Sequence, residues 1–193
     1  VAEDGDAVDR TESPGRNPFL EQFYLNVTKH GLASELYFLM RRAEAVEVIH
    51  AEEAANNRIV ADFLLEKDQI FAPVVLTGTE PGDEQNLFWQ IKHKVMPEFP
   101  LPDVVIYLES SDETAKKRLQ QRGDNLINLF PAGYLKSINQ EYRNFFHLYE
   151  NAPVLIANAD EMDFAENDDH FEMLIRALAG MTGNRYYLNL RDK

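Results

Sequence analysis

The chain has 193 residues and is 45% hydrophobic, which is enough to bury one substantial core. Its length favours a single domain that comprises residues 1–193. A net charge of −14 argues against binding to a nucleic-acid polymer, because an acidic surface repels phosphate backbones. The absence of cysteine excludes a disulfide framework, a thiolate nucleophile and a cysteine-based zinc site.

The predicted elements alternate between strands and helices. Strands are expected where short runs rich in β-branched residues lie between turn signals, and helices where apolar residues recur every three or four positions. In chain order, the predictions are a strand at 6–12, a helix at 33–53, a strand at 57–63, a loop at 77–85, a strand at 103–109, helices at 112–122 and 134–149, a strand at 152–158 and a helix at 170–178. This order predicts an α/β fold in which a mainly parallel sheet is covered by helices on both sides.

We expect neither a membrane-spanning helix nor a signal peptide in this sequence. Its apolar runs are far shorter than the ~20 residues that a membrane-spanning helix needs. Residues 1–15 are acidic and lack the apolar stretch of a signal peptide. The five histidines show no metal-ligand spacing. We therefore expect a cytoplasmic protein whose partners are small molecules or proteins and not membranes.

Three segments point to a function. The first runs from Glu12 to Tyr24 and reads Glu-Ser-Pro-Gly-Arg-Asn-Pro-Phe-Leu-Glu-Gln-Phe-Tyr. The second combines Leu36-Tyr-Phe-Leu-Met-Arg-Arg42 with Ile59-Val-Ala-Asp-Phe-Leu-Leu-Glu-Lys-Asp-Gln-Ile-Phe-Ala72. The third contains Ile106-Tyr-Leu, Glu113-Thr and Arg118-Leu-Gln-Gln-Arg-Gly123, and ends at Tyr134-Leu135. In order and spacing, these segments resemble the bacterial branch of the deoxynucleoside kinase family, from about residue 6 to residue 178.

The resemblance implies a P-loop kinase-like three-layer fold and the ATP-dependent phosphorylation of the 5′-hydroxyl of a deoxynucleoside. ATP and Mg²⁺ are the implied cofactors, and a homodimer is expected because the relatives form dimers. Glu35 stands where many members have a glutamine that reads the base, and an ionised carboxylate offers only acceptors. The base preference is therefore open, and a purine is preferred by resemblance only.

The implied catalytic residues are Glu12, Arg118 and Arg122. By resemblance, Glu12 is the general base that accepts the proton of the 5′-hydroxyl. Arg118 and Arg122 are four residues apart, so they project from one helix face, where two guanidinium groups can clamp a phosphoryl group. They belong to the implied lid at about 118–133. Taken alone, Glu12 would be a solvated charge at a strand end, and the two arginines would merely match the helix dipole.

The implied binding residues fall into three groups. Phe19, Tyr24, Glu35 and Arg41 would line the base pocket, with Arg41 one turn further along the helix face of Glu35. Asp62 would help to hold Mg²⁺ and Lys67 would supply a cation, although alone both are ordinary polar residues near a strand end. Asp160, Met162 and Phe164 follow the last predicted strand, where the family places the loop that borders the adenine of ATP. The aromatic residues would serve equally well in a core.

The phosphate-binding loop of the family has no counterpart in this sequence. No segment reads Gly-x-x-x-x-Gly-Lys-Ser/Thr, whose amides cradle phosphates and whose lysine reaches between them. By resemblance, the chain starts inside or just after the first helix of the fold, and the P-loop strand is absent. Either the polypeptide is an N-terminally incomplete kinase, which we favour, or it is a shortened, non-catalytic relative that acts through protein contacts.

Overall fold

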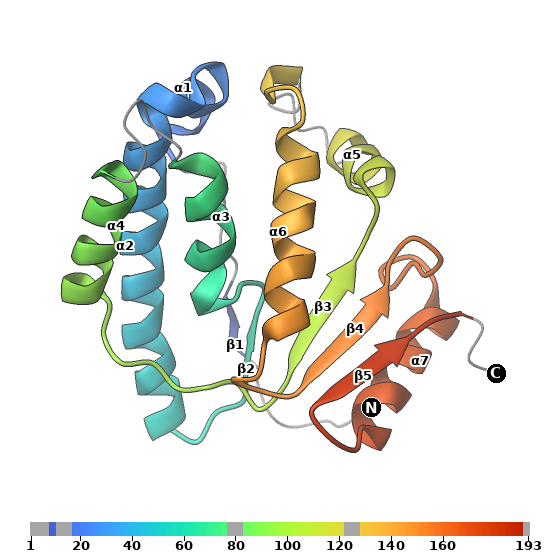
Figure 1. Ribbon diagram of the computed structural model, residues 1–193. Helices are drawn as coiled ribbons and strands as arrows, with labels where there is room; N and C mark the ends of the chain where they lie inside the picture. The colour runs from blue at the N-terminus through green and yellow to red at the C-terminus, as the bar shows by residue number, and fades with distance from the viewer. Residues whose placement is uncertain (1–7, 11–16, 77–82, 122–127, 191–193) are drawn as a thin grey trace. The chain divides into compact units, whose positions relative to one another are not determined.

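A computed structural model of the chain describes residues 8–10, 17–76, 83–121 and 128–190 (Figure 1). The chain divides into two compact units. Unit 1 comprises residues 1–100 and 128–134, and unit 2 comprises residues 101–127 and 135–193. The expected single domain, with its lid near 118–133, stays a prediction.

Unit 1 combines a pair of parallel strands with several helices. Its described elements are β1 (Val8–Arg10), α1 (Leu20–Leu25), α2 (Val27–Ala54), β2 (Ile59–Ala61), the short 3₁₀-helix η2 (Leu65–Lys67), α3 (Asp68–Val75) and α4 (Asp83–Val95). β1 and β2 pair in parallel, with Val8 opposite Ile59. The long helix α2 is the centre of the unit, because α1, α3 and α4 all pack against it.

Polar residues set both ends of α2. At its start, the side chain of Asn26 accepts a hydrogen bond from the backbone N–H of Lys29 at 3.1 Å, which satisfies one of the free donors of the first turn. Just beyond its end, Asn56 has a φ of 58°, the left-handed conformation that commonly terminates helices. Asparagine is one of the few residues that adopts this conformation readily.

Close packing fixes α2 against its neighbours. A Cβ atom at Gly31 would lie 2.8 Å from Cγ1 of Val75, so only glycine lets α2 and α3 approach this closely. Further along α2, Val46 and Ile49 form a small core with Leu65. Burial of these side chains is the main favourable term that holds the helices together.

Unit 2 is a three-layer α/β/α arrangement. Its described elements are β3 (Val105–Glu109), α5 (Asp112–Gln121), α6 (Tyr134–Leu148, whose first residue is counted with unit 1), β4 (Val154–Asn158), α7 (Asp168–Gly180) and β5 (Arg185–Leu188). The strands form a parallel sheet in the order β3-β4-β5. The central strand β4 is almost fully buried, as expected for a strand covered on both faces.

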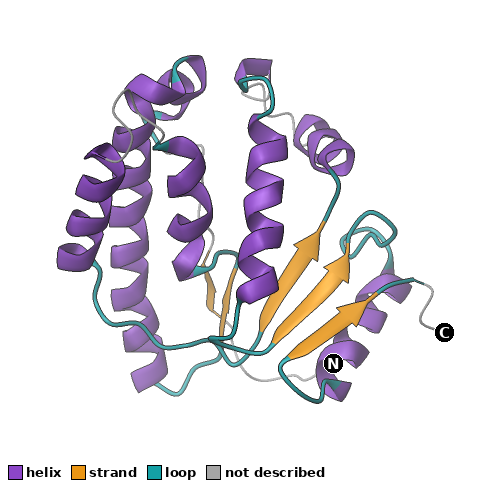
Figure 2. Cartoon of the chain, in the orientation of Figure 1, coloured by secondary structure: helices purple, strands orange, loops and turns teal. Residues whose placement is uncertain are grey.

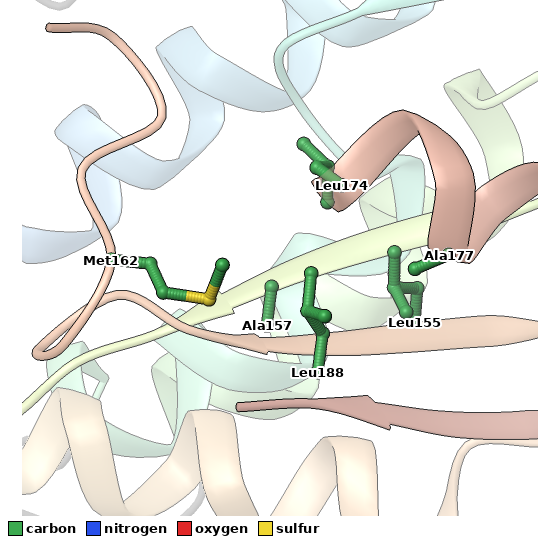
Figure 3. Close-up of a cluster of buried hydrophobic side chains, with 6 residues drawn as sticks. All are labelled: Leu155, Ala157, Met162, Leu174, Ala177 and Leu188. Atoms are coloured by element: carbon green, nitrogen blue, oxygen red, sulfur yellow. The ribbon is translucent and has the colours of Figure 1, made fainter. Parts of the chain in front are cut away.

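Helices α6 and α7 cover opposite faces of this sheet. On one face, Tyr107 of β3 stacks on Phe146 of α6 with ring centroids 4.2 Å apart. Neighbouring strand residues point to opposite faces, and Tyr107 pairs with Ile156, so Leu155 points to the other face. There it packs against α7 in a core of buried side chains, shown in Figure 3: Leu155, Ala157, Met162, Leu174, Ala177 and Leu188.

The α/β class and the parallel, helix-covered sheet predicted from the sequence are confirmed (Figure 2). All four predicted strands and all four predicted helices are present, although α2 begins six residues before the predicted start at 33. The predicted loop at 77–85 is wrong for 83–85, which begin α4, while 77–82 lie outside the described residues. α1, η2, α3, α4 and β5 were not among the predicted elements.

Candidate active site

Two of the three predicted catalytic residues, Glu12 and Arg122, lie outside the described residues. Their convergence with Arg118 on one phosphoryl group therefore stays a prediction. The described part of the chain does show the surroundings of Arg118 and of all nine predicted binding residues.

The carboxyl ends of β3 and β4 form a polar rim in unit 2. The loop after β3 leads into α5 through Ser111, and the loop after β4 begins with Ala159 and Asp160. Both carboxylate oxygens of Asp160 accept from the backbone N–H of Ser111, at 2.9 and 3.1 Å. The hydroxyl of Ser111 donates to the same carboxylate at 3.0 Å. In parallel α/β sheets, ligands bind at this end of the strands.

The environment of Asp160 favours its charged form. Partial burial by itself would raise the pKa of Asp160, but hydrogen bonds from Thr114 and from the amide and hydroxyl of Ser111, together with the charge of Arg118, lower that pKa below its ordinary value. Asp160 is therefore an ionised acceptor whose oxygens are engaged within the protein.

Arg118 lies on α5 and reaches the loop that follows β4. Its Nη2 atom donates to the carbonyl oxygen of Ala159 at 2.8 Å and lies 3.5 Å from that of Met162. Within the described residues, both of these hydrogen bonds come from Nη2, and a guanidinium carries further N–H donors on Nη1 and Nε. The structure thus holds one predicted catalytic arginine at the polar rim of the sheet.

The loop at 158–164 is organised by its own side chains. The Met162 side chain is 1% exposed and belongs to the core under α7, and Phe164 packs against that core. Oδ1 of Asp163 accepts from the amides of Ala165 and Glu166, both at 3.1 Å. Met162 therefore anchors the loop from below, and any contact of this residue with an adenine would come from its backbone.

In unit 1, Glu35 is buried on α2 with 4% of its surface exposed. Arg41, predicted to share its helix face, is instead exposed and forms an ion pair with Glu44. Six residues correspond to about 600° of rotation, which puts Arg41 far from the direction of Glu35. Arg42, seven residues from Glu35, returns to the same face and is 4% exposed. The prediction that Arg41 shares the helix face of Glu35 was wrong, because the next residue, Arg42, occupies that face.

Arg42 belongs to a buried charge cluster that the sequence analysis missed. Its guanidinium pairs with one carboxylate oxygen of Asp68, which is fully buried at the start of α3. The other oxygen of Asp68 lies 2.9 Å from Nζ of Lys92 on α4. We call Arg42, Asp68 and Lys92 the charge triad. The seven-residue spacing of Glu35 and Arg42 places Arg42 on the buried face of α2, but no local pattern links it to Asp68 or Lys92.

Phe19 and Tyr24, two predicted base-pocket residues, take part in aromatic contacts of unit 1. The Phe19 ring is 41% exposed and lies 6.4 Å from that of Tyr37. The Tyr24 ring lies 4.4 Å from Phe130 and 5.9 Å from Tyr134. Tyr24 is therefore packed against the last part of the predicted lid segment, in agreement with the alternative that these aromatic residues serve as packing residues.

Asp62 and Lys67 lie near the carboxyl end of β2. Asp62 follows the strand directly and is exposed. Lys67 ends η2, and its Nζ lies 5.5 Å from the centre of the Phe71 ring. The described residues contain no cluster of three or more potential metal ligands. A single exposed carboxylate nevertheless suits Mg²⁺, which takes most of its ligands from water and phosphate.

A sequence model of one family, described as Deoxynucleoside kinase, matches residues 4–181. The chain belongs to the deoxynucleoside kinase family. It is 27% identical over 179 residues to the deoxyguanosine kinase of Lactobacillus johnsonii, covering 87% of this chain and 78% of that protein. It is 25% identical over 173 residues to the deoxyadenosine/deoxycytidine kinase of Bacillus subtilis, covering 88% of this chain and 79% of that protein.

The fold is likewise that of solved deoxynucleoside kinase structures. The deoxyadenosine kinase of M. mycoides with bound dCTP superposes with a TM-score of 0.74 at 23% identity, over 91% of this chain and 87% of that one. The same enzyme with bound dATP gives 0.72 at 25% identity, over 90% and 87%. The predicted family and enzyme class, a phosphotransferase of the deoxynucleoside kinase type, are confirmed.

Within the described residues, no helix combines the length and the apolarity that a membrane crossing requires.

Proposed function

We propose that this protein transfers the terminal phosphoryl group of ATP to the 5′-hydroxyl of a deoxynucleoside. The observation that carries the proposal is the match of a deoxynucleoside kinase family model to residues 4–181, nearly the whole chain. The placement of Arg118 at the carboxyl edge of the sheet in unit 2 supports it, because ligands of such sheets bind at that edge.

In unit 2, the residues near this edge suit the phosphate donor. The loop at 158–164 would border the adenine of ATP, and Arg118, with Arg122, would neutralise the charge that develops on the transferring group. Asp62 would contribute one carboxylate to Mg²⁺, which would supply positive charge to neutralise the phosphates. ATP as donor is also supported by a relative whose structure contains bound dATP.

In unit 1, the residues suit the acceptor. Glu12 would accept the proton of the 5′-hydroxyl, and Phe19, Tyr24 and Glu35 would surround the base. On the helix face of Glu35, Arg42 replaces the predicted Arg41 as the arginine of this group, since Arg42 is buried there and Arg41 is exposed.

A preference for purine deoxynucleosides, a cytoplasmic location and a homodimer complete the proposal. The purine preference is supported by relatives named for deoxyguanosine and deoxyadenosine, although the B. subtilis relative is also named for deoxycytidine. No Gly-x-x-x-x-Gly-Lys-Ser/Thr occurs in the 193 residues. We therefore expect very slow transfer by this polypeptide alone, because no segment of it supplies the cradle for the β- and γ-phosphates.

The test measures binding first and transfer second. Calorimetry with deoxyguanosine, deoxyadenosine, deoxycytidine and thymidine should detect binding of at least one of them by the 193-residue chain. Glu35→Ala should abolish this binding, because Glu35 is the buried acidic group of the proposed pocket. Glu44→Ala, on the same helix but exposed and paired with Arg41, is the matched control and should bind like wild type.

Transfer of radiolabelled phosphate from ATP should then disappear in Glu12→Gln, which keeps the size of the side chain but removes its basic oxygen. Failure to bind any of the four deoxynucleosides would overturn the proposal and leave the non-catalytic relative as the better description. Equal losses in Glu35→Ala and Glu44→Ala would reject the proposed pocket.

A further inference from the structure

A ring of hydrogen bonds joins α5 to the loop at 158–164 in unit 2. At one point of this ring, the Asp160 carboxylate accepts from the amide and hydroxyl of Ser111, just before α5. At the other point, Arg118, two turns along α5, donates to the backbone carbonyl of Ala159. The helix is thus tied to one loop through both its first turn and its last turn.

The contacts at the start of α5 depend on Asp160. The Ser111 hydroxyl oxygen accepts from the backbone N–H of Thr114 at 3.2 Å, as the capping residue of a helix does. The same hydroxyl donates its single proton, and Asp160 is an acceptor 3.0 Å away. A carboxylate that accepts from an amide and a hydroxyl at once makes charge-assisted hydrogen bonds, which are stronger than neutral ones.

The loop at 158–164 is held in place by the core and the sheet of unit 2. The side chain of Met162 is buried in the core beneath α7, and the backbone N–H of Ala159 donates to the carbonyl of Glu109 at 2.8 Å, which extends the β3–β4 ladder. The side chain of Asn158 accepts from the amide of Asp160 at 3.0 Å. The position of the Asp160 carboxylate is therefore set by the sheet and its core.

We infer that Asp160 is a positioning residue that, through Ser111 and the first turn of α5, sets where Arg118 is held, so that the loop and the arginine move as one unit. Its carboxylate is engaged within the protein, so it acts through α5 and does not need to touch a ligand. We call the contact of Asp160 with Ser111 the latch. Its role in nucleotide binding rests on the proposed function, whereas its role in fixing α5 does not.

Hydrogen–deuterium exchange of the 193-residue protein tests the latch without ligand. Asp160→Ala should speed exchange about tenfold in peptides that cover 111–118, where the Ser111 amide loses its charge-assisted acceptor, and also in those that cover 159–162, where the loop loses its link to α5. Exchange of the α7 amides around Leu174 should stay unchanged, which shows that unit 2 remains folded.

Asp163→Ala is the matched control. It removes the same charge from the same loop, but the carboxylate of Asp163 accepts from the amides of Ala165 and Glu166 and not from α5. We expect faster exchange at 165–166 and wild-type exchange at 111–118. Equal acceleration of 111–118 in both variants would overturn the latch, because loss of charge alone would then explain it.

A second pair of variants covers the case in which Asp160→Ala unfolds unit 2. Ser111→Ala should accelerate exchange at 159–162 on the other side of the latch, and Ser111→Thr, which keeps the hydroxyl, should restore it. The effects of Ser111→Ala and Asp160→Ala should be less than additive, because both remove the hydrogen bond from the Ser111 hydroxyl to the carboxylate. Wild-type exchange at 159–162 in Ser111→Ala, or additive effects, would reject the inference.

The arm with MgATP separates this inference from the proposed function. In the wild type, MgATP should slow exchange at 159–164 and at 111–118 together, and in Asp160→Ala the slowing at 111–118 should be much smaller, because only Arg118 then links this segment to the loop. Equal slowing at 111–118 in both proteins would overturn the coupling. If MgATP slows exchange nowhere, the proposed donor site fails, while the ligand-free comparison still decides whether the latch exists.

Discussion

The interiors of the two units differ in kind. In unit 2, the core under α7 consists of aliphatic side chains and a methionine: Leu155, Ala157, Met162, Leu174, Ala177 and Leu188. In unit 1, the buried residues include charged groups on α2 and around the start of α3: Glu35, Arg42, Glu66 and Asp68. The polar groups of unit 2 that we propose to bear on function, Arg118 and Asp160, lie at the rim of its sheet.

This difference matters because burial of apolar and of charged side chains has opposite energetic consequences. An apolar core stabilises a fold because the burial of apolar side chains is itself favourable. A buried cluster of charges is often no more stabilising than an apolar replacement, because each charge loses its hydration. Our hypothesis is that the charge triad fixes the face of α2 that carries Glu35.

Asp68→Ala should produce the largest effect. It leaves Arg42 buried without its carboxylate and also removes the partner of Lys92, so unit 1 should lose about 3–5 kcal/mol of stability. Trp89, the single tryptophan, lies on α4 beside Lys92 and reports the urea unfolding of unit 1 by fluorescence. A loss below about 1 kcal/mol would show that the cluster is solvated in solution.

Leu155→Ala should cost unit 2 about 2–5 kcal/mol, because Leu155 is fully buried on the central strand and its loss leaves a cavity. Leu148→Ala is the control, since Leu148 is 77% exposed and should change stability by no more than about 0.5 kcal/mol. Scanning calorimetry gives both values. Similar losses for the two variants would contradict the described packing.

A smaller effect concerns Asp160. Its pKa in the folded protein lies below the ordinary 3.8, so its contribution to stability is present above that pH and is lost as pH falls through the folded pKa. Thr114→Val should raise this pKa toward 3.8, because a hydrogen bond to the carboxylate is removed. Carboxyl ¹³C NMR titration measures the pKa of Asp160 in the wild type and in Thr114→Val. Both proteins retain Arg118, so its charge affects the two values alike.

Asp163 provides the control for this titration. Its pKa is lowered chiefly by hydrogen bonds from the amides of Glu166 and Ala165, which Thr114→Val does not touch. The titration of Asp163 should therefore be the same in both proteins. A parallel shift of the two carboxyl groups would mean that the loop as a whole had moved.

The smallest effect is expected for Arg41→Ala. Arg41 is exposed and its ion pair with Glu44 lies at the surface, so the stability of unit 1 should change by no more than about 0.5 kcal/mol. Urea unfolding followed by Trp89 fluorescence checks this. A loss of several kcal/mol would place Arg41, and not Arg42, in the interior.

Much of the fold could be predicted from local patterns. The runs at 103–109 and 152–158 are apolar and β-branched, so they predicted β3 and β4 correctly. α3 and β5 were missed because they are short, and Pro73 within α3 is a residue that usually argues against a helix. α4 was partly hidden because Gly78, Pro81 and Gly82 just before it mark a loop.

The site was less predictable than the fold. Arg118 could be named because its spacing from Arg122 matches a motif, but no motif indicates that its guanidinium reaches the carbonyl of Ala159, 41 residues away. Asp160 could be named only as a residue that follows a strand. Its partner Ser111 lies 49 residues earlier in the chain, and local sequence carries no information about such a pairing.

By itself, the sequence determined the α/β class, the main elements and the kinase resemblance, because hydrophobic periodicity and motif spacing are local properties of the chain. Only the tertiary structure decided that Arg42 is buried against Asp68, that Met162 belongs to the core and that Asp160 is bound to Ser111. Those outcomes depend on which distant segments pack together, and burial and hydrogen bonding between such segments are properties of the folded chain.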